Sequence, residues 1–109
     1  MKVCDIAEKL SLRPLSIADS SREVTGAYIG DLLSWVMGRA ESGDAWITIM
    51  SNINIVAVAS LADVACIILA EGVVPDENVC ATALQKGINI FTSDKTAYVL
   101  ATELAQCLQ

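Results

Sequence analysis

The sequence of 109 residues contains no histidine and few positively charged residues. Without histidine, the chain lacks the commonest general base, the commonest metal ligand and the usual proton shuttle. Lysine and arginine number 7 against 13 aspartate and glutamate, which gives a net charge of −6, and no basic run occurs anywhere. Binding to the phosphate backbone of nucleic acid requires such basic surfaces. We therefore expect no nucleic-acid partner.

The four cysteines are widely spaced and form no C-x-x-C pair; they are Cys4, Cys66, Cys80 and Cys107. This spacing is not that of a zinc knuckle or an ordinary iron–sulfur loop, so we expect small apolar side chains in a reducing compartment. No phosphate-binding G-x-x-x-x-G-K-[ST] motif occurs. Because no histidine is present and no lysine adjoins a cysteine, a serine or cysteine nucleophile would lack a base. The sequence predicts neither a catalytic residue nor a cofactor.

Long hydrophobic segments are also scarce. The first residues lack the long apolar stretch of a signal peptide, so we expect a cytoplasmic protein. Residues 53–70 are interrupted only by Asn54, Ser60 and Asp63, which leaves a membrane span as an alternative. Asp63 near the middle would cost about 2.5–3.5 kcal/mol at the centre of a bilayer, and no lysine or arginine flanks the segment. We therefore expect no membrane partner.

Apolar residues are abundant instead. Hydrophobic types make up 54% of the chain and charged types 18%, against about 25% charged in an average domain. The length suits one domain with one core. A chain this apolar has more apolar surface than its own core needs, so we expect one face to be buried against a partner, as a homodimer.

Hydrophobic periodicity predicts alternating strands and helices. Residues 55–58 are rich in β-branched types and favour a strand by propensity, but a helix there supplies the crossover that the next parallel strand needs. The sequence thus predicts one α/β domain over residues 1–109, with a mainly parallel sheet and helices on both faces. Residues 1–22 form an N-terminal helix and strand, and residues 23–109 form the core strand–helix units. The predicted helices cover 2–10, 32–40, 53–60, 76–86 and a final segment after Asp94; the predicted strands cover 15–18, 24–29, 45–49, 65–70 and 88–91.

The order of these blocks resembles the DRTGG domain family over most of the chain. The blocks that carry the resemblance are Thr25-Gly26-Ala27, the helix of residues 32–40, Trp46-Ile47-Thr48, the stretch from Ala65 to Gly72, the stretch from Lys86 to Phe91, and Ser93-Asp94-Lys95-Thr96-Ala97. The family is similar to the N-terminal domain of the bacterial kinase that phosphorylates a serine of the phosphocarrier HPr. It also occurs between paired CBS domains in some pyrophosphatases.

The resemblance implies a regulatory or oligomerising module and not a catalytic one. Stand-alone members accompany iron-only hydrogenase genes. A typical member carries a Gly-Asp-Arg-like segment after the third strand and a Thr-Gly-Gly-like segment after the fourth. Here these positions are Met50-Ser51-Asn52 and Ala70-Glu71-Gly72, so the resemblance does not transfer a phosphate site to them.

A parallel sheet would gather the loops that follow its strands at one edge, where open α/β sheets bind ligands. The candidate ligand-binding residues in these loops are Gly30, Asp31, Ser51, Asn52, Asn54, Glu71, Gly72, Ser93 and Asp94. As an alternative, Asp31, Ser51, Asn52, Ser93 and Asp94 act only as helix N-caps. Asp31, Glu71 and Asp94 together suggest a cation site, but no second acid stands near any of them, so we predict no metal.

Together these features favour a non-catalytic regulatory or ligand-sensing DRTGG-type domain that acts as a dimer, with a nucleotide-like molecule as its candidate ligand. The alternative is a scaffold or accessory protein in a larger redox complex of the iron-only hydrogenase type. A small-molecule enzyme comes third, because Asp31, Glu71 and Asp94 are its only candidate acids.

Overall fold

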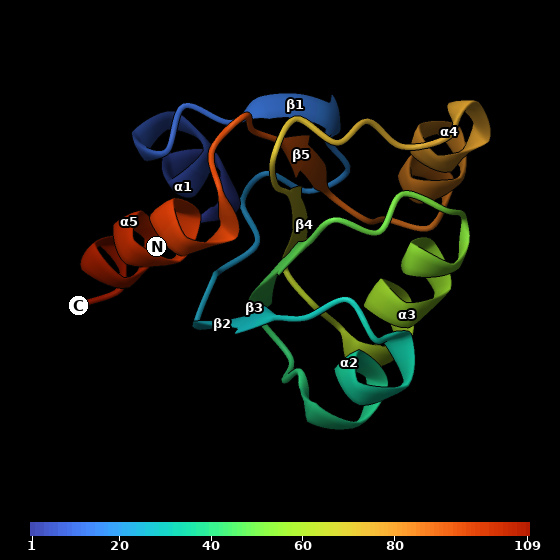
Figure 1. Ribbon diagram of the computed structural model, residues 1–109, viewed down its shortest axis with the longest axis horizontal. Helices are drawn as coiled ribbons and strands as arrows, with labels where there is room; N and C mark the ends of the chain where they lie inside the picture. The colour runs from blue at the N-terminus through green and yellow to red at the C-terminus, as the bar shows by residue number, and fades with distance from the viewer.

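The ten helices and strands follow one another in the order that the hydrophobic pattern predicts. The computed structural model describes residues 1–109 (Figure 1). The elements are α1 (Val3–Lys9), β1 (Arg13–Ser16), β2 (Gly26–Ile29), α2 (Leu33–Arg39), β3 (Asp44–Thr48), α3 (Asn54–Ala62), β4 (Cys66–Leu69), α4 (Glu77–Gln85), β5 (Ile90–Thr92) and α5 (Ala97–Cys107).

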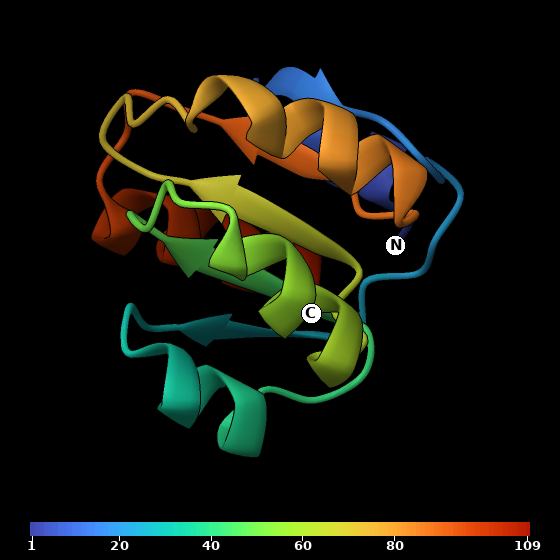
Figure 2. The same ribbon diagram turned by 90° about the vertical axis from the view of Figure 1, so that its right-hand side faces the viewer.

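The strands form one five-stranded sheet in the order β1-β5-β4-β3-β2. Strands β2, β3, β4 and β5 are parallel, and β1 is antiparallel to β5. In Figure 2 the four parallel arrows point the same way, so the segments that follow them leave from one edge of the sheet. The mainly parallel α/β sheet expected from the sequence is therefore confirmed.

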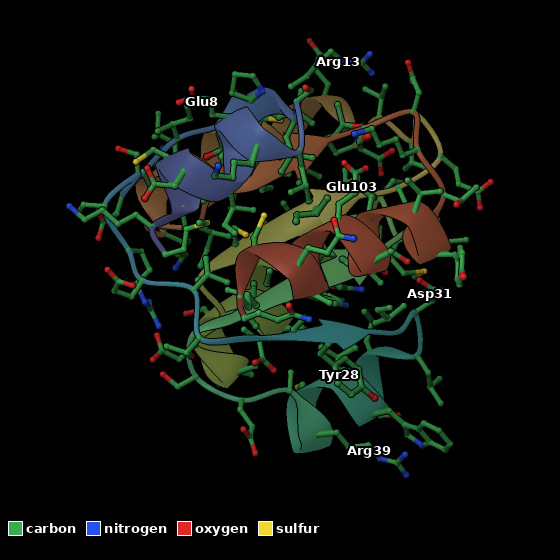
Figure 3. All side chains as sticks on the ribbon, turned by 90° about the vertical axis from the view of Figure 1, so that its left-hand side faces the viewer. Glu8, Arg13, Tyr28, Asp31, Arg39 and Glu103 are labelled. Carbon is green, nitrogen blue, oxygen red and sulfur yellow. The ribbon has the colours of Figure 1, made fainter.

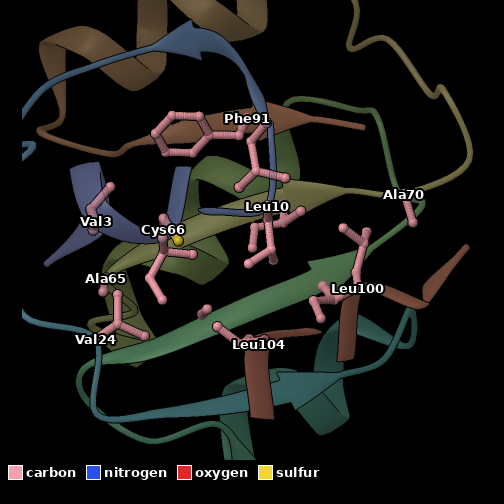
Figure 4. Packing of buried hydrophobic residues seen from close by; sticks show 14 residues of the cluster. Val3, Leu10, Val24, Ala65, Cys66, Ala70, Phe91, Leu100 and Leu104 are labelled. Carbon is pink, nitrogen blue, oxygen red and sulfur yellow. The ribbon is translucent and has the colours of Figure 1, made fainter. Parts of the chain in front are cut away.

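Helices cover both faces of this sheet. Helices α2, α3 and α4 lie on one face, and α1 and α5 lie on the other (Figures 1 and 2). Every residue of β3, β4 and β5 is buried, as expected for strands covered on both sides. Successive side chains alternate between two hydrophobic clusters, so that Trp46 packs towards α3 and α4 whereas Ile47 and Cys66 pack towards α1 and α5 (Figure 4).

Residues 53–70 contain a helix and a strand, so the single membrane span considered above is wrong. Helix α3 includes the β-branched residues 55–58, and the strand alternative is also wrong. No helix of the protein combines the length and the hydropathy that a membrane crossing requires.

Asp63 ends α3 in a left-handed conformation with a φ of 57°. Hydrogen bonds from Ser42 and then Arg22 hold the pKa of Asp63 below its usual value.

The ends of the elements differ most from the sequence prediction. The first strand begins at Arg13 and ends at Ser16, earlier than expected. The last helix begins at Ala97, and its N-cap is Thr96, whose side chain accepts a hydrogen bond from the N–H of Val99 at 3.2 Å. The alternative in which Ser93 or Asp94 is the N-cap of the last helix is therefore wrong. Gly87 has a φ of 76° directly after α4, and Asp76 precedes α4 without a capping bond from its side chain.

The buried side-chain amide of Asn89 holds the segment between β1 and β2 against the sheet. The Asn89 side chain is almost fully buried and makes four hydrogen bonds. Its oxygen accepts from the N–H groups of Ala18 and Asp19 at 2.9 and 2.8 Å. Its nitrogen donates to the carbonyl oxygens of Asp19 and Ala65 at 2.8 and 3.0 Å. Asn89 thus joins the segment after β1 to the start of β4.

Replacing Asn89 should therefore destabilise the fold strongly. Because Asn89→Ala removes four hydrogen bonds and leaves a buried carbonyl unpaired, we expect a loss of about 2–4 kcal/mol of unfolding free energy. Urea denaturation followed by circular dichroism measures this loss. The control is Asn78→Ala on exposed α4, where no side-chain bond is lost; equal losses in the two variants would contradict the assigned role of Asn89.

Candidate functional site

The four loops that follow the parallel strands lie along one edge of the sheet, and this strand-end edge carries all nine candidate residues (Figure 2). The residues form three groups within it. Gly30 and Asp31 follow β2, Ser51 to Asn54 follow β3, and Glu71, Gly72, Ser93 and Asp94 follow β4 and β5. No hydrogen bond joins one group to another.

The loops after β4 and β5 hold each other through their backbones. The N–H of Glu71 donates to the Lys95 carbonyl and that of Gly72 donates to the Ser93 carbonyl, both at 2.8 Å. Glu71 and Gly72 have positive φ values of 58° and 72°, and a Cβ on Gly72 would stand 3.0 Å from Asp94 Oδ1. The amides of this tight turn are already engaged and are not free to hold an anion.

Two cations that the sequence analysis missed reach this group. The Arg13 guanidinium lies 3.4 Å from Asp94 Oδ2, with both side chains exposed. Lys95 Nζ lies 2.8 Å from Glu103 Oε1 and donates to the Leu10 carbonyl at 3.1 Å. Arg13 arrives here because β1 runs antiparallel to β5, which places the beginning of β1 beside the end of β5.

Gly30 and Asp31 form hydrogen bonds with β3 and with the residue that follows it. The Gly30 carbonyl accepts a hydrogen bond from Trp46 Nε1 at 2.9 Å. Asp31 Oδ1 accepts from Thr48 Oγ1 at 2.7 Å and from the N–H of Ile49 at 3.0 Å. Asp31 is therefore not the N-cap of α2, which is Leu32. It fixes the turn that leaves β3.

The turn between β3 and α3 contains backbone N–H groups that have no hydrogen-bond partner. Asn52 Oδ1 accepts from the N–H of Asn54 at 2.9 Å, whereas the N-cap residue of α3 is Ile53, which has no side-chain capping bond. The Ser51 carbonyl accepts from the N–H of Asp76 at 3.1 Å. The N–H groups of Ser51, Asn52 and Ile53 donate to no group of the protein. Three adjacent donors at a helix N-terminus are suited to an anion or a ligand hydroxyl.

A groove of about 470 Å³ begins at this turn and follows α3 and α4. Of the nine candidate residues, only Asn54 lines a surface groove or pocket of the protein. No sequence signal predicted the groove, because it forms only where two helices lie side by side. Its lining residues are Ile53, Asn54, Val56, Ala57, Ser60, Leu61, Thr82 and Lys86.

Acidic and cysteine side chains do not gather into a metal-binding group of three or more anywhere in the protein. Asp94 faces Arg13 and Asp31 faces Thr48, so Asp31, Glu71 and Asp94 do not form a cation site together. Cys66 is fully buried in the core, and this burial raises the pKa of its thiol to about 12. Cys4 is exposed on α1.

Comparison with known proteins gives two findings. A model of the DRTGG domain family matches residues 5–107. The structure is similar to the CBS and DRTGG domains of the regulatory region of Clostridium perfringens pyrophosphatase, crystallised with its activator diadenosine tetraphosphate, at a TM-score of 0.78 and 16% identity. The match covers 96% of this chain and 46% of that chain, so this chain spans less than half of the neighbour. No curated protein matches the sequence.

The role of Asp31 in the turn after β3 is testable by comparison with Asp76. Because Asp31→Ala removes two hydrogen bonds, we expect it to lower the unfolding free energy by about 1–2 kcal/mol. Asp76→Ala removes no side-chain bond and should cost about 0.5 kcal/mol through the helix dipole alone. Thermal or urea denaturation of both variants measures the difference, and an equal cost would contradict the assignment.

The cysteines should differ sharply in reactivity. Only a thiolate reacts with iodoacetamide, so the raised pKa and the burial of Cys66 should protect it in native protein at pH 8. The exposed Cys4 should be alkylated in the native protein. Mass spectrometry of peptides from native and urea-unfolded samples measures both. Fast native alkylation of Cys66 would show that the core around β4 opens.

Proposed function

This chain belongs to the DRTGG domain family, and from this premise we propose that it is a non-catalytic regulatory domain that senses a nucleotide-like ligand and works as a dimer. The observation that carries the proposal is the juxtaposition of three unpaired amides with the groove along α3 and α4. The amides can hold a phosphate group, and the groove can hold a nucleobase. Binding of this kind requires no proton-accepting side chain such as histidine, which the chain lacks.

The amides of Ser51, Asn52 and Ile53 are the part of the site suited to a phosphate. They lie at the positive end of α3, a helix of nine residues, and phosphate groups are favoured there by both the free donors and the dipole. A net charge of −6 repels polyanions at a distance. Neutral backbone donors overcome this repulsion only at short range, which makes shape as well as charge a requirement for binding.

The groove is the part suited to a base. Its volume of about 470 Å³ falls within the range of small-molecule sites, about 300–1,000 Å³. Ala57 leaves room in its wall, and Ser60 and Thr82 carry hydroxyl groups beside it. Lys86 lies at its far end, so a ligand with a phosphate at each end would meet a donor at both ends of the groove. The activator of the pyrophosphatase neighbour, diadenosine tetraphosphate, is an adenine compound with several phosphates.

Ligand binding would act through the loops that the site connects. The hydrogen bond from the Asp76 N–H to the Ser51 carbonyl joins the loop after β3 to the segment before α4. A ligand on Ser51 to Ile53 therefore orders both segments and fixes α3 against α4. Regulation follows if the ordered form differs in affinity for a partner chain, because a ligand shifts the population towards the form that binds it better.

A thermal-shift titration tests the proposal. Diadenosine tetraphosphate, ATP and adenosine are added separately to the full chain. A ligand at about 100 times its dissociation constant adds about 2.7 kcal/mol, which raises the melting temperature of a domain of this size by roughly 10 °C or more. We expect a rise with at least one phosphorylated adenine compound and a smaller rise with adenosine.

Two matched substitutions of alanine by glutamate show where the ligand binds. Ala57→Glu fills the groove and adds a negative charge, so it should abolish the rise. Ala105→Glu makes the same change at an exposed position of α5, away from the groove, and should keep it. A screen without any rise, or a rise that survives Ala57→Glu, would contradict the proposed site. Silence across the screen would favour the accessory-protein alternative.

A further inference from the structure

The two faces of the sheet are not covered equally. Three helices lie on one face, whereas only α1 and α5 lie on the other, and α5 packs against both β3 and β2 (Figure 3). Ala27 and Ile29 of β2 are exposed, and Ile29 keeps 50% of its surface in solvent. Ile47, which pairs with Ile29 on the neighbouring strand, is fully buried. Helix α5 therefore buries β3 completely but leaves Ala27 and Ile29 of β2 open to solvent.

Strand β2 is also an edge of the sheet. It pairs with β3 on one side and with no strand on the other. Natural edge strands are protected against further pairing by charges, proline or bulges. Gly26–Ile29 contains no charged residue and no proline, and its register with β3 is regular over all four residues. The free side of β2 thus lacks the charge, the proline and the bulge that would prevent another strand from adding to it.

The helix beside this open face is almost without charge. Glu103 is the only charged residue of α5, and it is paired with Lys95. Tyr98 and Val99 at the start of α5 are exposed, with 80% and 39% of their surfaces in solvent. Ile49, two residues beyond Ile47 and so on the same face, is 46% exposed. We name the surface made by Ala27, Ile29, Ile49, Tyr98 and Val99, together with the free side of β2, the β2 surface.

We propose that a second copy of this chain covers the β2 surface, with the two β2 strands antiparallel across a two-fold axis perpendicular to the sheet. Such an axis reverses the direction of the strand and keeps the faces, so the two sheets become one sheet of ten strands with both α5 helices on the same side. An isologous contact of this kind requires a self-complementary surface. An uncharged apolar strip beside a regular strand edge is complementary to itself.

Charge supports a second copy as the occupant. The chain carries a net charge of −6, so two copies repel each other through most of their surfaces. The β2 surface has no charged side chain, and contact there avoids placing like charges opposite each other. A lipid surface is disfavoured because the β2 surface lacks the lysine and arginine residues that attract anionic lipids.

This inference deepens the dimer part of the proposed function by assigning its interface, and it does not depend on the ligand. Strand pairing at β2 would leave the groove between α3 and α4 open, since these helices lie on the opposite face of the sheet (Figure 2). The ligand and the interface can therefore fail separately.

Sedimentation equilibrium at micromolar concentrations tests the interface. We expect the wild-type chain at twice its mass of 11.5 kDa. Ile29→Lys places a charge opposite its own copy and should raise the dimer dissociation constant by at least tenfold. Ala27→Lys, at a second exposed position of β2, should do the same if Ile29→Lys proves unfolded by circular dichroism. Leu84→Lys on α4 is the matched control, because Leu84 is 56% exposed on the opposite face and lies outside the groove, and it should remain dimeric.

The outcomes separate the two proposals. A monomeric wild-type chain would overturn the dimer itself. A folded Ile29→Lys or Ala27→Lys variant that stays dimeric, or a Leu84→Lys variant that becomes monomeric, would overturn the assigned interface. The thermal shift with diadenosine tetraphosphate is repeated on Ile29→Lys: an unchanged shift in a monomer supports the interface and leaves the ligand site standing, whereas loss of the shift in a folded monomer would overturn their independence.

Discussion

The structure depends on the complete burial of its central strands. Every residue of β3, β4 and β5 is buried, and their side chains pack into two hydrophobic clusters, one on each face. Parallel strands must be joined by crossovers that lie above or below the sheet, and such sheets are stable when both of their faces are covered. The polar turns that follow β2 to β5 are then forced to one edge. The position of the candidate site is thus a consequence of how the core is packed.

The same constraint explains where the protein is incomplete. The three crossover helices α2, α3 and α4 lie on one face, whereas α1 and α5 cover the other face and leave Ala27 and Ile29 of β2 exposed (Figures 2 and 3). A chain with 54% hydrophobic residues has apolar surface left over, and the structure places a continuous part of it at Ala27, Ile29 and Val99. The proposed ligand sensing on one face and the proposed self-association at the β2 edge are compatible because they involve different elements.

Much of this architecture could be predicted from the sequence, and the reasons are local. The apolar run from Ala65 to Ala70 indicates a buried strand, and the need for a crossover identifies residues 53–60 as a helix against their β propensity. Caps were harder, since Asp31, Ser93 and Thr96 all have suitable side chains and only tertiary contacts select between them. Asp31 is drawn to Thr48 on the next strand. Thr96 caps the last helix instead of Ser93.

The parts of the site that sequence analysis missed come from residues distant along the chain. Arg13 reaches Asp94 only because β1 is antiparallel, and the groove exists only because α3 and α4 lie side by side. Neither leaves a periodic signal. Of the candidate residues, Gly30, Asp31, Glu71 and Gly72 are engaged in holding turns, whereas three adjacent N–H groups, those of Ser51, Asn52 and Ile53, donate to no group of the protein.

The most direct test of the account is a residue-resolved nuclear magnetic resonance titration of the full chain with diadenosine tetraphosphate. The account predicts that the amide signals of Ser51, Asn52 and Ile53 move together with those along the α3 side of the groove, at the edge where the parallel strands end. Shifts concentrated at the opposite edge, around Gly43 and Val64, would contradict it.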